Sequence, residues 1–253
     1  MVGTFAALAD DGEWNMPDVS PGHRRENVEW QLSYSYHVTD ANRCLPRVLL
    51  VGDSICNGYK DGVARLLEGK ANVTYWVTSK SVTDASYLKF LSLFLEEYDY
   101  RVIHFNNGLH SLNDDPQDYE KCLRAAVKMI KAKARGAKLA WANSTPLAKD
   151  DVTKRVRLLN EVAMRVMREE GVPINDLFSL MDPLDREEFW RDTFHFKPKA
   201  VRQQAEKVAD AIKDLLCCPA MGTTAAVAHD SPERRQDRGV NVWTKCSEGR
   251  EPR

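Results

Sequence analysis

The sequence predicts an α/β domain in which helices cover both faces of a parallel sheet. Short apolar segments typical of buried strands alternate with longer segments whose apolar residues recur at helical spacing. This alternation occurs five times, with a helical segment in every crossover. Parallel strands require such crossovers, and right-handed connections distribute the helices over the sheet. The expected class is therefore a three-layer α/β/α domain built on five parallel strands.

Each element follows from a local pattern. The strands are expected at residues 48–51, 73–78, 100–105, 138–142 and 172–176. The helices are expected to begin near Ser54, Asp84, Pro116, Asp151 and Pro198. Proline suits the first position of a helix because it lacks an N–H that would remain unpaired there. Gly136 and Gly171 are typical of the residue that follows the last turn of a helix.

The strands and helices divide the chain into three parts. Residues 47–216 are expected to form the α/β/α domain. Residues 1–46 form an N-terminal arm, in which apolar and polar residues alternate over 28–38. This period of two predicts an extended segment that either adds an edge strand or forms a lip over the site. Residues 217–253 have few apolar residues and many charged ones, so we expect a mobile tail, with a partner-binding segment as the alternative.

Composition argues against several classes of protein. The chain has 36 Lys and Arg against 37 Asp and Glu, so no overall field favours nucleic acid or an anionic membrane. No apolar run is long enough to span a bilayer, and residues 1–13 lack the pattern of a signal peptide. The six cysteines are scattered without the spacing of a zinc site. We expect a cytoplasmic protein with reduced thiols and without nucleic-acid or membrane partners.

The first candidate catalytic residue is Ser54. It follows the apolar strand at 48–51 through Gly52 and Asp53, and it precedes a segment of helical period. The carboxyl edge of a parallel sheet is where ligands bind, and a helix N-terminus offers free N–H groups to an anion. A serine at this point can attack a carbonyl while backbone donors face the developing oxyanion. Asp and Ser are also ordinary helix caps, so this motif alone leaves both interpretations open.

The second candidate is the pair Asp192 and His195. A serine hydroxyl needs a base to accept its proton, and the base needs a partner that fixes its tautomer. The spacing of three residues on a helical turn would put both side chains on the same side, so the carboxylate can hold the imidazole. The alternative is a surface Asp beside a His that packs on Trp190 and Phe196. Because both motifs follow strands of the sheet, we expect Ser54 and His195 at one rim.

These motifs resemble those of a known family. Residues 48–55, the loop after the third strand, and Asp192 to His195 followed by Phe196-Lys197-Pro198 are similar to the SGNH hydrolases, also called the GDSL esterase/lipase family. The resemblance covers 47–216 and implies a flavodoxin-like sheet with strand order 2-1-3-4-5. It also implies ester hydrolysis through an acyl-enzyme, with Ser54 as nucleophile, His195 as general base and then acid, and Asp192 as the residue that orients His195.

The chain departs from the family pattern at the oxyanion hole. The backbone N–H of Ser54 would be one donor. The family has a glycine in the loop after the second strand, whereas residues 79–82 contain none, although another backbone N–H of that loop can serve. The family's next motif carries an asparagine after glycine, but here Gly108 is followed by His110 and preceded by Asn107. Either Asn107 or His110 can donate to the oxyanion, and similarity to related polysaccharide O-acetyltransferase-type esterases favours Asn107.

The rim loops indicate a polar substrate. They offer polar side chains and one aromatic ring rather than an aliphatic cluster, so we expect Asn57, Ser81 and Trp190 to contact substrate. A small acyl group on a polar or sugar-like alcohol fits these loops, and the expected ligand is a small-molecule ester. The alternatives are a non-catalytic binding protein that uses the same crevice, and an acyltransferase. No metal or nucleotide signature is present, so no cofactor is expected.

Overall fold

The computed structural model describes residues 29–36, 38–39 and 41–217. Its centre is a six-stranded sheet with strand order β1-β3-β2-β4-β5-β6. Five strands run parallel, namely β2 (Arg47–Gly52), β3 (Asn72–Thr78), β4 (Tyr100–Phe105), β5 (Lys138–Ala142) and β6 (Ile174–Asn175). Counted alone, they have the order 2-1-3-4-5, so the expected fold class is confirmed.

The helices fill the crossovers as the periodicity predicted. They are α1 (Ser54–Leu66), α2 (Tyr87–Glu97), α3 (Pro116–Lys133), α4 (Asp150–Glu169), α5 (Leu177–Met181), α6 (Arg186–Phe189) and α7 (Pro198–Cys217), with a 3₁₀ turn η1 (Leu109–Ser111). None of the helices in the described part of the chain combines the length and hydrophobicity needed to cross a bilayer. The expected tail at 217–253 lies outside the described residues except for Cys217, which is the last residue of α7.

The sixth strand, β1 (Gln31–Ser35), comes from the segment with alternating residues. It pairs antiparallel with β3, with Gln31 opposite Thr78 and Ser35 opposite Thr74. Of the two expectations for this segment, the edge strand is therefore the one observed. The rest of the N-terminal arm, residues 1–28, lies outside the described residues.

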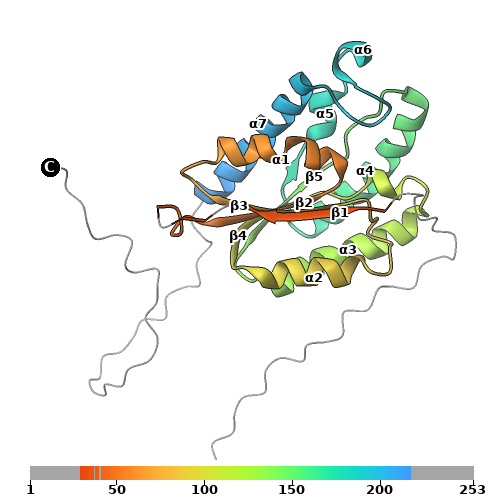
Figure 1. Ribbon diagram of the computed structural model, residues 1–253. Helices are drawn as coiled ribbons and strands as arrows, with labels where there is room; N and C mark the ends of the chain where they lie inside the picture. Colours follow the sequence, from red (N-terminus) through yellow and green to blue (C-terminus); the bar gives the residue numbers. More distant parts are fainter. Residues whose placement is uncertain (1–28, 37, 40, 218–253) are drawn as a thin grey trace, which may run out of the picture.

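The sheet separates two apolar cores. In β2, Val48 and Leu50 belong to the core under α1 and α7, whereas Leu49 and Val51 belong to the core under α2, α3 and α4. Side chains of a strand alternate between faces, so a strand buried on both faces is apolar throughout. Figure 1 shows the resulting layers, with α1 and α7 on one side of the sheet and α2 and α3 on the other.

One expectation about cysteine is not met. Cys44 is disulfide-bonded, whereas Cys56, Cys122 and Cys217 are free thiols. Reduced thiols throughout the chain were expected because no pair of cysteines has a recognisable spacing. Disulfide connectivity depends on which loops meet in the fold, and sequence spacing does not report it.

Of two glycines on the side of α1 that faces α7, one allows the two helices to approach closely. A Cβ added at Gly62 would lie 2.7 Å from the Cβ of Ala205, a distance that real Cβ atoms do not show. A Cβ added at Gly58 would lie 3.9 Å from Val201 Cγ2, an ordinary contact. Glycine at position 62 therefore allows the two helices to pack with their backbones close together.

We expect Gly62→Ala to destabilise the protein and Gly58→Ala to leave it unchanged or stabilise it. Overpacking at a backbone-fixed contact costs about 1–3 kcal/mol, whereas replacing an unobstructed helical Gly by Ala contributes about 0.5–1 kcal/mol. Urea denaturation of both variants measures the difference. If Gly62→Ala were at least as stable as Gly58→Ala, the proposed helix contact would be wrong.

His104 of β4 is fully buried in the sheet and is remote from solvent. Its Nε2 lies 3.0 Å from Asn175 Nδ2, which donates to the neutral imidazole. Burial lowers the pKa of His104 from 6.5 to about 4. The unfolded chain therefore binds this proton at higher pH than the folded protein does, and stability falls as the pH falls through this window.

Acidification from about pH 7 to about pH 5 should lower the free energy of unfolding by about 2 kcal/mol through His104. Urea denaturation as a function of pH measures this loss. His104→Gln has no titrating group at this position, so its stability should change less across the same range. An unchanged pH dependence in His104→Gln would assign the effect to other groups.

Candidate active site

Ser54 lies at the first residue of α1, directly after the central strand β2. The preceding Asp53 caps the helix, because its Oδ1 accepts a hydrogen bond of 2.8 Å from Ile55 N. The turn is tight: a Cβ added at Gly52 would lie 2.5 Å from Cys56 Cβ, so glycine is required where the helix folds back over the strand end. Strand, glycine and cap together place the half-buried Ser54 at the carboxyl edge of the sheet.

Asp192 and His195 form a local pair. His195 Nδ1 lies 2.9 Å from both carboxylate oxygens of Asp192. Asp192 Oδ1 also accepts from the backbone N–H groups of Phe194, at 2.9 Å, and His195, at 2.8 Å. Burial acts to raise the pKa of Asp192, but these hydrogen bonds outweigh it and hold the pKa well below its usual range. The carboxylate therefore stays ionised and fixes the imidazole with Nε2 directed away from it.

The loop that carries this pair is anchored to the rest of the sheet edge. Trp190 pairs with Phe196 across the loop, and their ring centroids are 4.5 Å apart. Trp190 Nε1 donates to the carbonyl of Pro146 at 3.3 Å, and Ala148 N donates to the carbonyl of Thr193 at 2.9 Å. The loop after β5 therefore holds the Asp192 segment on both sides, at Trp190 and at Thr193.

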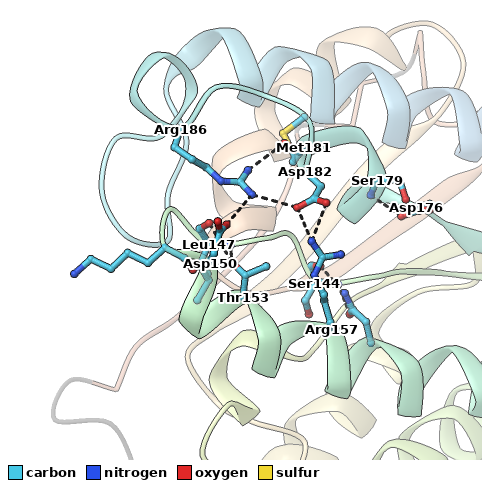
Figure 2. A network of polar contacts seen from close by, with 12 residues as sticks. Ser144, Leu147, Asp150, Thr153, Arg157, Asp176, Ser179, Met181, Asp182 and Arg186 are labelled. Carbon is cyan, nitrogen blue, oxygen red and sulfur yellow. Dashed lines mark hydrogen bonds and ion pairs between the residues drawn. The ribbon is translucent and has the colours of Figure 1, made fainter.

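A polar network supports the same loop from the side of α4. Figure 2 shows the guanidinium of Arg157 donating to both oxygens of Asp182, at 3.0 and 2.9 Å. Arg186 donates to Asp182 at 3.2 Å and lies 3.8 Å from Asp150. The same guanidinium lies over the ring of Trp190, 4.3 Å from its centroid. These contacts connect α4, α5 and α6 to the residue that begins the Asp192 loop.

One groove brings the predicted catalytic residues together. Ser54, Asn57 and His195 all line a groove of about 850 Å³. Among the described residues, no hydrogen bond joins Ser54 to His195, and such catalytic hydrogen bonds often form only when substrate is bound. No group of three or more His, Cys, Asp or Glu in the described residues is arranged to hold a metal.

Asn107 holds the loop that follows β3. Its Oδ1 accepts from Val82 N at 3.0 Å, and its Nδ2 donates to the carbonyl of Lys80 at 2.9 Å. The two bonds lie on either side of Ser81. One N–H of the Asn107 amide is used in this way, and the second is not needed for the loop.

Neither Ser81 nor Trp190 is among the residues that line the groove, and their contact with substrate stays a prediction. The Ser81 hydroxyl is buried and donates to Asp114 Oδ2 at 2.7 Å, and it lies 2.6 Å from Ser111 Oγ. Trp190 is buried among the contacts described above. Both were expected at the surface because loop residues near a strand end are usually exposed, but here tertiary contacts cover them. His110 lies in η1, beyond Asn107.

Two kinds of residue near the site were not predicted from the sequence. Asp114 fixes Ser81 from a loop distant in sequence, and no local pattern indicates such a contact. Arg65 and Arg202 line the groove with Ser54. Arg65 lies on the same side of α1 as Ser54, and this helical spacing could have identified it.

Comparison with known proteins identifies the fold. No protein-family model and no curated protein matches the chain. Solved structures do match, and an acetyl xylan esterase is 16% identical with a TM-score of 0.57, covering 66% of this chain and 99% of its own. A lipase/acylhydrolase from Enterococcus faecalis is 20% identical with a TM-score of 0.54, covering 67% and 96%. A lipolytic protein of the G-D-S-L family from Veillonella parvula is 17% identical with a TM-score of 0.56, covering 66% and 98%.

The chain has the SGNH-hydrolase fold. This agrees with the resemblance found in the sequence. The SGNH fold also accounts for the strand order, because the order of the parallel strands here is the one that the resemblance implied. In this chain, β1 adds an antiparallel edge to that sheet.

Asn107→Ala should destabilise the protein, because it leaves the buried Val82 N–H and Lys80 carbonyl without their partner. Unpaired buried polar groups cost about 1–3 kcal/mol each. Amide hydrogen exchange at Val82 should become faster than in the wild type, and urea denaturation should show the lower stability. Asn113→Ala, at an exposed position, is the control and should change neither measurement. Wild-type exchange at Val82 in Asn107→Ala would show that the amide does not hold the loop.

Proposed function

We propose that the protein is a serine carboxylic ester hydrolase. The observation that carries this proposal is the single groove lined by Ser54 and by a His195 whose imidazole is fixed by Asp192. These three residue types in this arrangement form the constellation that acyl transfer to a hydroxyl requires. The SGNH fold of solved lipases and esterases supports the same activity.

The mechanism follows from the chemistry of the three residues. His195 Nε2 accepts the proton of the Ser54 hydroxyl as Oγ attacks the ester carbonyl. Asp192 stabilises the imidazolium that forms. The tetrahedral intermediate collapses, the alcohol leaves with the proton from His195, and the acyl group remains on Ser54. Water then attacks the acyl-enzyme as His195 takes its proton, and His195 returns that proton to Ser54 Oγ as the carboxylic acid is released.

The oxyanion needs several donors. Ser54 N–H at the start of α1 is one. A backbone N–H of the loop after β3 is a second, because Asn107 holds this loop through Lys80 and Val82 where the family has a glycine. The second N–H of the Asn107 amide or an N–H of His110 is the third. Such donors stabilise the negative charge more strongly in a fixed site than water does.

The preferred substrate carries a small acyl group on a polar alcohol. The groove beside Ser54 is lined by Asn57 and by charged side chains on both helices. A long acyl chain would leave these groups desolvated without partners, whereas a polar alcohol can hydrogen-bond to them. The name of the acetyl xylan esterase among the structural neighbours is consistent with an ester of this kind.

Ser54→Ala should lower kcat/KM for p-nitrophenyl acetate by at least about a thousandfold, because it removes the nucleophile. Asp192→Asn should lower it by about a hundredfold or more, because the imidazole loses its ionised partner. Wild type should hydrolyse the acetyl ester faster than esters of longer acids. Ser92→Ala, on α2, is the matched control and should behave as wild type.

The same assay separates the alternatives. Trapping of an acyl group on the Ser54 peptide, detected by mass spectrometry, would support the acyl-enzyme. Equal rates for wild type and Ser54→Ala on every ester would instead indicate a non-catalytic binding protein. Turnover that requires an added alcohol acceptor would indicate an acyltransferase.

A further inference from the structure

The groove at Ser54 continues along the contact between α1 and α7. Figure 1 shows these two helices side by side on one face of the sheet. On α1, the groove is lined by one stripe of the helix from Ser54 to Leu66. At a rise of 1.5 Å per residue, this stripe is about 18 Å long. The groove is therefore much longer than a small acyl group and has room for an extended molecule beyond the reacting bond.

Each wall of this groove carries one carboxylate and one guanidinium. On α1 these are Asp61 and Arg65, and on α7 they are Glu206 and Arg202. A third arginine, Arg191, lines the groove from the loop before α7. Within the described part of the chain, no ion pair uses Arg65, Arg202 or Glu206. Charged groups are thus available to a ligand on both sides of the groove, Arg65 on α1 and Arg202 and Glu206 on α7.

Asp61 is held by residues other than Arg65. The hydroxyl of Tyr36 donates a hydrogen bond to the carboxylate of Asp61. Lys60 Nζ lies 3.3 and 3.2 Å from the two oxygens of the same carboxylate. Partial burial acts to raise the pKa of Asp61, but the hydrogen bonds from Tyr36 and Lys60 outweigh it, and the pKa lies below its usual value. The carboxylate is therefore an ionised acceptor in a fixed position. The positive charge of Arg65 also lowers this pKa, but Arg65 forms no ion pair with Asp61.

Gln204 of α7 also lines the groove and is fully buried. Neither its Oε1 nor its Nε2 has a hydrogen-bond partner among the described residues. A buried amide without partners is costly, so a ligand group that both donates and accepts would stabilise this part of the groove.

We propose that the groove between α1 and α7 binds a chain of sugar residues that forms the alcohol part of the ester. This rests on the proposed function of Ser54. A sugar hydroxyl both donates and accepts, so it can use the carboxylates and the guanidinium groups together. A polyanion would meet the carboxylates of Asp61 and Glu206, and an aliphatic chain would offer no polar partner to Arg65, Arg202 or Glu206. Val201 and Phe196 provide apolar surface for the C–H faces of the rings.

The kinetic test compares an acetylated xylohexaose with acetylated xylose. Wild type should have a kcat/KM for the hexasaccharide ester at least about tenfold above that for the monosaccharide ester. Arg65→Ala and Arg202→Ala should each lower the ratio of kcat/KM for the hexasaccharide ester to that for p-nitrophenyl acetate by about tenfold. Arg168→Ala, at an exposed arginine of α4 outside the groove, should keep the wild-type ratio. Unfolding curves of all variants show whether each is folded.

A binding test does not depend on catalysis. Isothermal titration of wild type with unacetylated xylo-, cello-, manno- and chitohexaose should show at least one hexasaccharide that binds about tenfold more tightly than its monosaccharide. Arg65→Ala and Arg202→Ala should weaken that binding, and Arg168→Ala should not.

The outcomes separate this proposal from the hydrolase proposal. If no hexasaccharide binds more tightly than its monosaccharide, or if both arginine variants bind as wild type, the groove proposal is overturned even when Ser54 is the nucleophile. If hexasaccharides bind as expected but wild type and Ser54→Ala are equally inactive on every ester, the groove binds saccharide chains and the hydrolase proposal fails.

Discussion

The close contact between α1 and α7 holds the two halves of the candidate active site in place. Ser54 is the first residue of α1, and His195 lies just before the start of α7. The two residues are far apart in sequence, and their separation is set by how these helices pack. Gly62 opposite Ala205 allows the helices to approach closely. A wider separation would move the base away from the nucleophile without changing either motif, because positioning errors of about 1 Å reduce catalysis.

Two side chains combine a structural and a chemical task in the site. Asp192 fixes the backbone of its own turn through two N–H groups and orients His195 with the same carboxylate. Asn107, at the end of the neighbouring strand β4, hydrogen-bonds to both Lys80 and Val82, and its amide has a second N–H that neither bond uses. Such groups are rigid because each hydrogen bond limits the freedom available to the others, and rigidity is what a preorganised site needs.

The elements of this fold could be predicted largely from local patterns. The strands at 100–105 and 138–142 agree with β4 and β5, because buried parallel strands are continuous apolar runs. The pairing of β1 was not predictable, since alternation shows an extended segment but not its neighbour. Among the site residues, the contact between Asp192 and His195 was predicted correctly, because these two residues are near each other in sequence. The burial of Ser81 and Trp190 could not be predicted, because it depends on Asp114 and Pro146, which come from other loops.

The antiparallel strand β1 has a consequence for the behaviour of the chain in solution. It covers the outer edge of β3, whose residues Val73 to Thr78 carry no charge and have high β propensity. An uncovered strand of this kind is a template for intermolecular pairing and aggregation. The exposed side chains of β1 alternate between the polar Gln31 and Ser33 and the larger Leu32 and Tyr34. The extra strand therefore prevents the edge of β3 from pairing with another chain.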